Sequence, residues 1–180
     1  MGLLKWPGYS GTPSGQWELI EPPTVVAGSA ETSFDFSTTL ADARWSGYRV
    51  EMVVANGYAG AVTYNLRANS NPIAGNRQYG FDSNTSVTTV RNTTVLIGSV
   101  GNGDESTMVV GIPFAVASLP ARHVFVDCVR NTAAAIDQYW AKISITTPSL
   151  ATEFTSLGIL ASQANGLGIG TVARLFGRVA

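Results

Sequence analysis

The sequence predicts an all-β fold, a single β-sandwich or β-barrel of about eight to ten short strands. Two observations lead to this prediction. Segments of alternating apolar and polar residues recur along residues 24–180, and turns rich in Gly, Asn and Pro separate them. Helical periodicity is confined to residues 132–137, which serve equally well as a loop. With 180 residues the chain fits one domain, preceded by a distinct segment at residues 1–23.

Residues 1–23 are expected to form an extended N-terminal arm. Gly and Pro separate the aromatic residues Trp6, Tyr9 and Trp17, without a period of 2 or 3.6 residues. Pro22–Pro23 ends the segment, because proline interrupts a regular ladder. The aromatic side chains need an apolar partner surface, either on their own domain or on a neighbouring subunit. They are the candidate binding residues of the arm.

Three strands are expected in the first half of the domain. The segment 48–55 alternates cleanly and ends at the turn dipeptide Asn56–Gly57. The inward-facing residues expected from the alternation are Tyr48, Val50, Met52, Val62, Tyr64 and Leu66. The strands of this half are 33–36, 48–55 and 61–67, followed by a loop at 69–76.

The pattern resumes in the second half of the domain. The expected strands are 86–90, 94–98, 106–116, 122–130 and 138–146. Pro113 lies within one of them, which favours an edge strand or a bulge at that point.

The last 27 or so residues predict two further strands joined by a Gly-rich turn. The sequence Asn165-Gly-Leu-Gly-Ile-Gly170 resembles a phosphate-binding glycine loop only superficially, since such a loop delivers a phosphate to a following helix. Here residues 171–176 alternate as a strand. We therefore expect a hairpin turn at 165–170.

Charge is scarce in this chain. Charged residues make up 13%, against about 25% in an average domain. This composition suits an all-β protein with neutral outer faces, and equally a surface that lies against another subunit. The net charge of −1 gives no electrostatic footprint for nucleic acid or an anionic membrane. The N-terminal apolar run is too short for a signal peptide, and no segment approaches a membrane span.

No residue pattern predicts catalysis, a metal or a cofactor. Cys128 is the only cysteine, and alternation places it with Val124 and Val126 on an inner face. His123 is the only histidine and has no nearby nucleophile or metal-ligand pattern. Asp104 and Glu105 are adjacent, but their spacing does not match a calcium loop. We expect a protein that is not an enzyme.

Exposed aromatic side chains could stack on sugar rings. Trp45 and Trp140 are candidates for such a platform, although a core position is the commoner place for Trp in a sandwich. The loop aromatics Tyr79 and Phe81 are further candidates.

A resemblance to a known class of proteins rests on a series of segments spread over residues 17–178. They are Trp17-Glu-Leu-Ile-Glu, Phe34-Asp-Phe36, Tyr48-Arg-Val, Trp140-Ala-Lys-Ile-Ser-Ile, Phe154-Thr-Ser-Leu-Gly-Ile-Leu and Gly168-Ile-Gly-Thr-Val-Ala-Arg-Leu-Phe-Gly177. Together they resemble small virion proteins of tailed bacteriophages, in which a terminal strand of this kind closes the sandwich. The resemblance implies a jelly-roll-like sandwich and a homo-oligomer such as a trimer, and it carries no catalytic residues.

Two functions are expected from this resemblance. The first is a capsid decoration (cement) protein that binds the major capsid protein on the outside of the virion and stabilises the head. The alternative is a tail-tip or fibre module that binds a receptor or a host glycan. In either case we expect synthesis in the host cytoplasm, and neither nucleic acid nor membrane as a partner.

Overall fold

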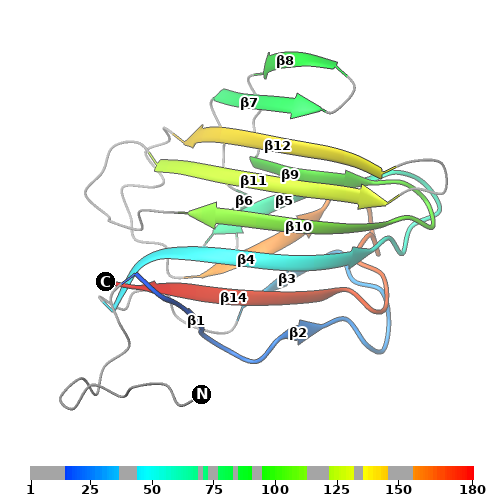
Figure 1. Ribbon diagram of the computed structural model, residues 1–180. Helices are drawn as coiled ribbons and strands as arrows, with labels where there is room; N and C mark the ends of the chain where they lie inside the picture. Colours follow the sequence, from blue (N-terminus) through cyan, green and yellow to red (C-terminus); the bar gives the residue numbers. More distant parts are fainter. Residues whose placement is uncertain are drawn as a thin grey trace, which may run out of the picture.

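The structure is a computed structural model, in which every described element is a strand (Figure 1). It describes residues 15–36, 44–68, 71–72, 77–82, 85–90, 95–112, 122–131, 136–145 and 156–180. The prediction of an all-β sandwich is confirmed, because these residues form two antiparallel sheets and contain no helix. Within them, no helix is long and apolar enough to cross a membrane.

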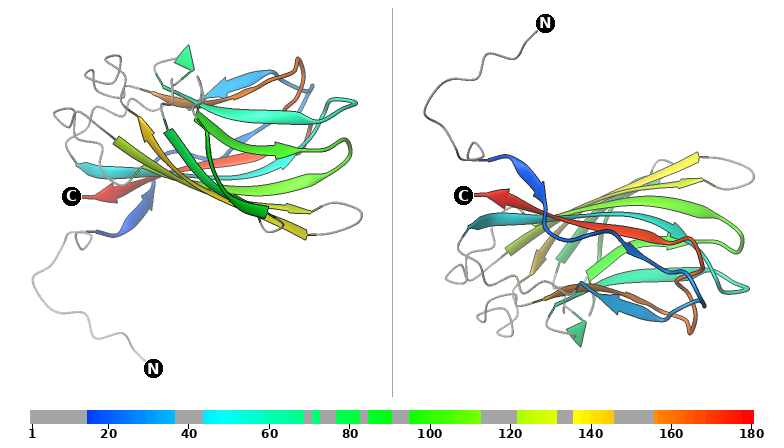
Figure 2. Two further views of the ribbon diagram at one scale, coloured as in Figure 1. Left: turned by 90° about the horizontal axis from the view of Figure 1, so that it is seen from above. Right: turned by 90° about the horizontal axis from the view of Figure 1, so that it is seen from below.

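The larger sheet contains nine strands. In spatial order they are β1 (Trp17–Leu19), β14 (Val172–Val179), β4 (Trp45–Ala55), β10 (Glu105–Ile112), β11 (Arg122–Asn131), β12 (Ile136–Ile145), β7 (Arg77–Asp82) and β8 (Thr85–Val90), and β2 (Thr24–Val25) also pairs with β14. The smaller sheet has the order β3 (Ser33–Asp35), β13 (Leu157–Ala161), β5 (Val62–Ala68) and β6 (Asn71–Pro72), with β9 (Val95–Val100) paired to β5. Figure 2 shows the sheets stacked as two layers.

The chain passes repeatedly between the two layers of the sandwich. β3 lies in the smaller sheet, β4 in the larger, β5 in the smaller, and β13 and β14 repeat this change at the C-terminal end. Strands from the two ends of the chain also pair, because β3 lies beside β13 and β4 lies between β14 and β10.

Alternating residues of both sheets fill the space between the layers. The inner residues predicted from the alternation are confirmed, since all six are no more than 2% exposed: Tyr48, Val50, Met52, Val62, Tyr64 and Leu66. The predicted inner residues of β11 are confirmed as well, and Val124, Val126 and Cys128 are at most 3% exposed. Burial of these side chains is the main favourable contribution to the stability of the fold.

The C-terminal strands differ from the expectation. Both exist, but β13 pairs with β3 and β5 whereas β14 pairs with β1, β2 and β4, so the predicted hairpin is wrong. The Gly-rich segment instead crosses from one sheet to the other. Leu167 anchors the crossing, since its side chain is fully buried and its N–H and C=O both bond to Glu31 at 2.8 Å. A Cβ on the neighbouring Gly168 would lie 2.8 Å from the carbonyl oxygen of Ala55, which requires glycine there.

Asn56 ties together the loops at the same end of the sandwich. Its side-chain Nδ2 donates to the carbonyl oxygens of Gly60 and Gly101, both at 2.8 Å, and its Oδ1 accepts from the N–H of Tyr58. The predicted Asn56–Gly57 turn is therefore also a connection between two loops. Its hydrogen bonds hold the end of β4 next to the turn after β9.

The N-terminal segment joins the sandwich earlier than residue 24. β1 pairs with β14 from Trp17 onward, and the N–H of Gly15 donates to the carbonyl of Val179 at 2.8 Å. Ile20 packs against the core as well. The last part of the segment expected as an arm, residues 17–19, is therefore an edge strand of the larger sheet.

Leu167→Ala is expected to lower the free energy of unfolding by about 2–5 kcal/mol, because it leaves a cavity at the crossing between the sheets. Ile169→Ala is the matched control, since that side chain is 61% exposed two residues away and its loss should change stability by less than about 0.5 kcal/mol. Urea unfolding measures both values. Equal losses in the two variants would contradict the role of Leu167 as the anchor.

Candidate binding face on the larger sheet

The larger sheet exposes apolar side chains on the face that points away from the smaller sheet. Alternation along its strands buries one set of residues and leaves the other set in water. The large apolar side chains exposed in this second set include Val53 (40%), Phe125 (45%), Val129 (38%) and Trp140 (47%). Exposed large apolar side chains gathered on one face of a sheet are typical of an interaction site. We call this surface the outer face.

One row of the outer face combines aromatic rings with cations. Following the pairing from β14 to β12, it consists of Phe176, Arg49, Gly111, Phe125 and Lys142, each opposite the next in the register. We call this row the aromatic–cation band. It crosses five adjacent strands and therefore spans about 19 Å. No acidic residue occurs in it.

A second row consists of branched, uncharged side chains. It runs through Val25, Val172, Val53, Thr107 and Val129, again as successive register partners. We call this row the valine stripe. It lies about 13 Å from the aromatic–cation band along each strand, because four residues of a strand rise about 3.3 Å each.

Arg49 is held between two rings at one end of the band. Its guanidinium carbon lies 4.9 Å from the ring centroid of Trp17 and 4.8 Å from that of Phe176. Its Nη2 also lies 3.0 Å from Oε1 of Glu51. These contacts join β1, β14 and β4, so the indole of Trp17 packs on its own sandwich. The flat guanidinium suits this position between two aromatic faces.

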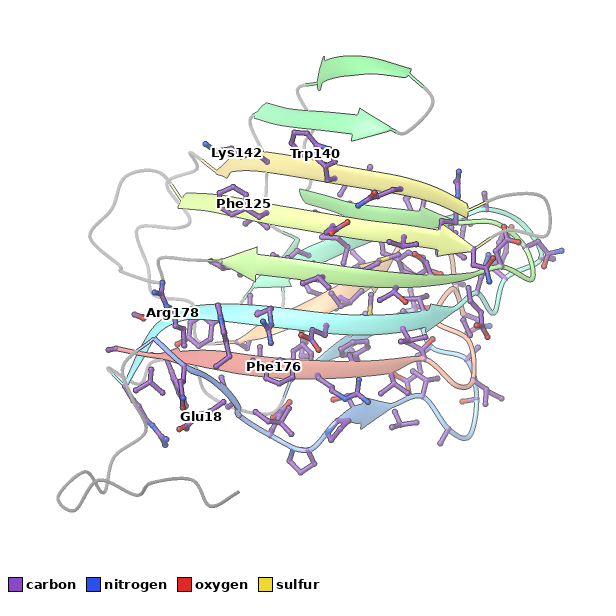
Figure 3. All side chains as sticks on the ribbon, in the orientation of Figure 1. Glu18, Phe125, Trp140, Lys142, Phe176 and Arg178 are labelled. Carbon is purple, nitrogen blue, oxygen red and sulfur yellow. The ribbon has the colours of Figure 1, made fainter. Side chains whose placement is uncertain are left out.

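The other end of the band lies on β11 and β12. Lys142 Nζ lies 5.8 Å from the ring centroid of Phe125, and Trp140 is one position diagonal to Phe125 in the pairing. Figure 3 shows Phe125, Lys142 and Trp140 on these neighbouring strands, and Phe176 on β14. Nε2 of Gln138 donates to Oδ1 of Asp127 at 3.2 Å beside them. Aromatic rings and hydrogen-bonding side chains therefore lie next to one another on this part of the outer face.

Gly111 leaves a gap in the middle of the band. A Cβ at this position would have no other heavy atom within 4 Å. Its strand neighbours in the register are Arg49 and Phe125. The backbone of β10 is therefore uncovered at Gly111, with Arg49 on one neighbouring strand and Phe125 on the other.

Cys128 and Tyr64 lie in the core, away from the outer face. Burial raises the pKa of the Cys128 thiol, and the strongest opposing influence is its 3.1 Å hydrogen bond with Oγ of Ser106. Burial likewise raises the pKa of Tyr64, whose hydroxyl donates to the carbonyl of Gly166 at 2.9 Å. A thiol whose ionised form is disfavoured is a poor nucleophile, so Cys128 serves packing. Among the described residues, no group of three or more His, Cys, Asp or Glu could hold a metal ion.

The other predicted site residues are scattered. Trp45 is half-buried against the core with the guanidinium of Arg44 4.5 Å above its ring, so it offers no free platform. Of the two positions that the sequence leaves open for Trp140, the structure shows the exposed one, because its side chain stands on the outer face of β12. Tyr79 and Phe81 pair with Lys142 and Trp140 in the register between β12 and β7.

Trp6 and Tyr9 lie outside the described residues. Asp104 lies in the turn before β10, where its N–H donates to the carbonyl of Gly101 at 3.3 Å.

Sequence reasoning missed Arg49, Phe125 and Lys142 as members of one site. A signal for Phe125 was present, since the alternation that buries Val124, Val126 and Cys128 must place Phe125 on the opposite face. Two large apolar residues on the outer half of a strand indicate an interaction surface. The role of Arg49 depends on pairing between distant strands, which no local pattern reveals.

No protein-family model matches the chain, and no curated protein matches it either. The candidate function therefore depends on the outer face itself and on the sequence pattern described above.

Arg49→Lys is expected to loosen β1, because a lysine ammonium cannot stack flat between two rings. Two cation–π contacts of about 0.5–1 kcal/mol each correspond to a five- to thirty-fold change in the opening equilibrium. Hydrogen exchange of the Gly15 and Ile20 amides, which bond to Val179 and Leu175, measures this opening. The control is Arg174→Lys on the exposed side of β14. Equal exchange in both variants would refute the clamp.

Folding stability is expected to fall as the pH rises above the ordinary thiol pKa of about 8.5. The folded chain keeps the Cys128 proton there while the unfolded chain releases it, so the unfolded state binds fewer protons and the free energy of unfolding decreases with pH. The contribution of the buried thiol is fully present below that pH. Urea unfolding at about pH 7.5 and 9.5 should show a smaller difference in Cys128→Ala. An unchanged difference would contradict the effect of burial.

Proposed function

We propose that this chain is a structural virion protein of a tailed bacteriophage, which binds the capsid exterior as a symmetric homo-oligomer and stabilises the head. The observation that carries the proposal is the valine stripe. Its exposed members include Val25 (53%), Val53 (40%) and Val129 (38%), on three different strands of one sheet. The partner surface is that of the major capsid protein, and the oligomer is a trimer in the simplest arrangement.

Surface of this composition suits contact with another protein. The cores of protein interfaces are depleted in charge, and no charged residue occurs in the valine stripe. A symmetric oligomer raises the overall affinity for the head, because several copies engage together.

The assignment to a virion rests on the sequence resemblance described above. The low overall charge supports it, since a chain with 13% charged residues has much neutral surface for contacts with neighbouring subunits. Of the three aromatic residues proposed for the arm, Trp17 is already stacked against Arg49 of its own chain. The arm contacts to a neighbouring subunit are therefore proposed for Trp6 and Tyr9.

A second candidate function is a carbohydrate-binding module of a tail tip or fibre. One observation favours it, namely the exposure of Phe125 and Trp140 beside the hydrogen-bonded pair Asp127 and Gln138. Sugar rings present an apolar face for stacking and hydroxyl groups at their edges, so this combination of groups suits them.

Val53→Glu together with Val129→Glu is expected to lower the affinity for phage heads at least about tenfold, because an unpaired carboxylate would be buried in the interface. Heads prepared without this protein are incubated with each variant, and occupancy is measured by co-sedimentation. Sedimentation equilibrium of the free protein reports its oligomeric mass. Both side chains are exposed, so the folded monomer should keep its thermal stability.

Asn102→Glu is the control, since it adds a carboxylate at an exposed turn outside the valine stripe. It should bind heads like the parent protein. Full occupancy of the heads by the double variant would contradict the role of the valine stripe, and a parent protein that does not bind heads would contradict the decoration function itself.

A further inference from the structure

We propose that the aromatic–cation band, together with the adjacent Trp140, binds an acidic polysaccharide. This inference deepens the carbohydrate-binding candidate and rests on it. It is independent of the valine stripe, which lies about 13 Å away along the same strands. One protein could thus attach to a particle through one row and bind a charged glycan through the other.

The arrangement of rings fits a chain of sugar units. Phe125 and Trp140 are 45% and 47% exposed and occupy diagonal positions on β11 and β12, where Cα atoms lie about 7–8 Å apart. Two rings so placed offer stacking surface to successive units of one chain. Asp127 and Gln138 hold each other at 3.2 Å and present further donor and acceptor positions for hydroxyl groups.

Charge complementarity selects an acidic chain over a neutral one. Lys142 is exposed, and none of the ion pairs between described residues involves it. Its described contact is with the ring of Phe125, so the ammonium is available for a charge-assisted hydrogen bond to a carboxylate. Arg49 lies three strands away, at about 14 Å, but its guanidinium already pairs with Glu51 and stacks between two rings. Lys142 is therefore the cation that a carboxylate of a sugar unit stacked on Phe125 would reach.

Gly111 makes room for such a chain next to Phe125. A Cβ at this position would have no heavy atom within 4 Å, so any side chain there would extend into the open space of the band. A polysaccharide that continues from Phe125 onto β10 passes over this position. The glycine therefore acts as a steric requirement for binding, although the strand itself tolerates other residues.

Titration calorimetry with a linear oligogalacturonate tests the proposal, and its fully methyl-esterified form serves as the neutral counterpart. An oligosialic acid and a poly-glutamate peptide complete the set of probes. We expect saturable binding of at least one acidic glycan, at least about tenfold tighter than the neutral form, equivalent to about 1.4 kcal/mol. Binding should weaken with salt, because the cations are exposed.

Four variants locate the site. Lys142→Gln should weaken the acidic glycan about tenfold while Lys142→Arg keeps most of the affinity. Trp140→Ala should abolish detectable binding. Gly111→Val should also abolish it without loss of thermal stability, because the added side chain meets open space. That variant separates blocked binding from failed folding.

Equal or absent binding of the acidic and neutral glycans would overturn the proposal. Poly-glutamate binding as tight as glycan binding would overturn it too, because the face would then recognise acidic protein. Val53→Glu should leave glycan binding intact, and a parent protein that binds the glycan but not the heads would refute only the decoration function.

Discussion

The fixed register between the strands of the larger sheet is the constraint on which the rest of the structure depends. β4, β10 and β11 bury every second residue against the smaller sheet, as Val50, Met108 and Val126 show. A slip of one residue would turn every inner side chain outward, so the core holds the register in place. The same register fixes which residues stand side by side on the outer face. Phe125 stands opposite Lys142 because Val124 and Val126 on the same strand are buried in the core.

Two further features protect this arrangement. Leu167 secures the crossing of the chain between the sheets, and β1 and β2 pair along β14, which would otherwise be an edge of the larger sheet. An uncovered edge invites pairing with other chains. The stacking of Arg49 between Trp17 and Phe176 holds β1 in this place. The aromatic–cation band thus has a structural role at one end and a surface available for binding at the other.

The sequence predicts the elements of this fold better than their partners. The alternation correctly predicts the inner residues of β4, β5 and β11, because a strand that is buried on one face carries apolar residues at every second position of the sequence. The crossing at Leu167 was predicted as a hairpin, since two consecutive alternating strands look the same whether they pair with each other or not. For Trp140 the sequence leaves both an exposed and a core position open, because the alternation does not show which residues of β12 face inward. The two rows of the outer face join residues from Val25 to Phe176, and only the register reveals them.

The central claim is that the outer face of the larger sheet is the binding face. Hydroxyl-radical footprinting of the free and the assembled protein tests it most directly, because side-chain oxidation reports solvent contact residue by residue. The account predicts that Val53, Phe125, Val129 and Trp140 lose reactivity on assembly or ligand binding, while Tyr58 at the end of the sandwich keeps its own. Unchanged reactivity of these four residues, with new protection on the outer side of β5 instead, would contradict it.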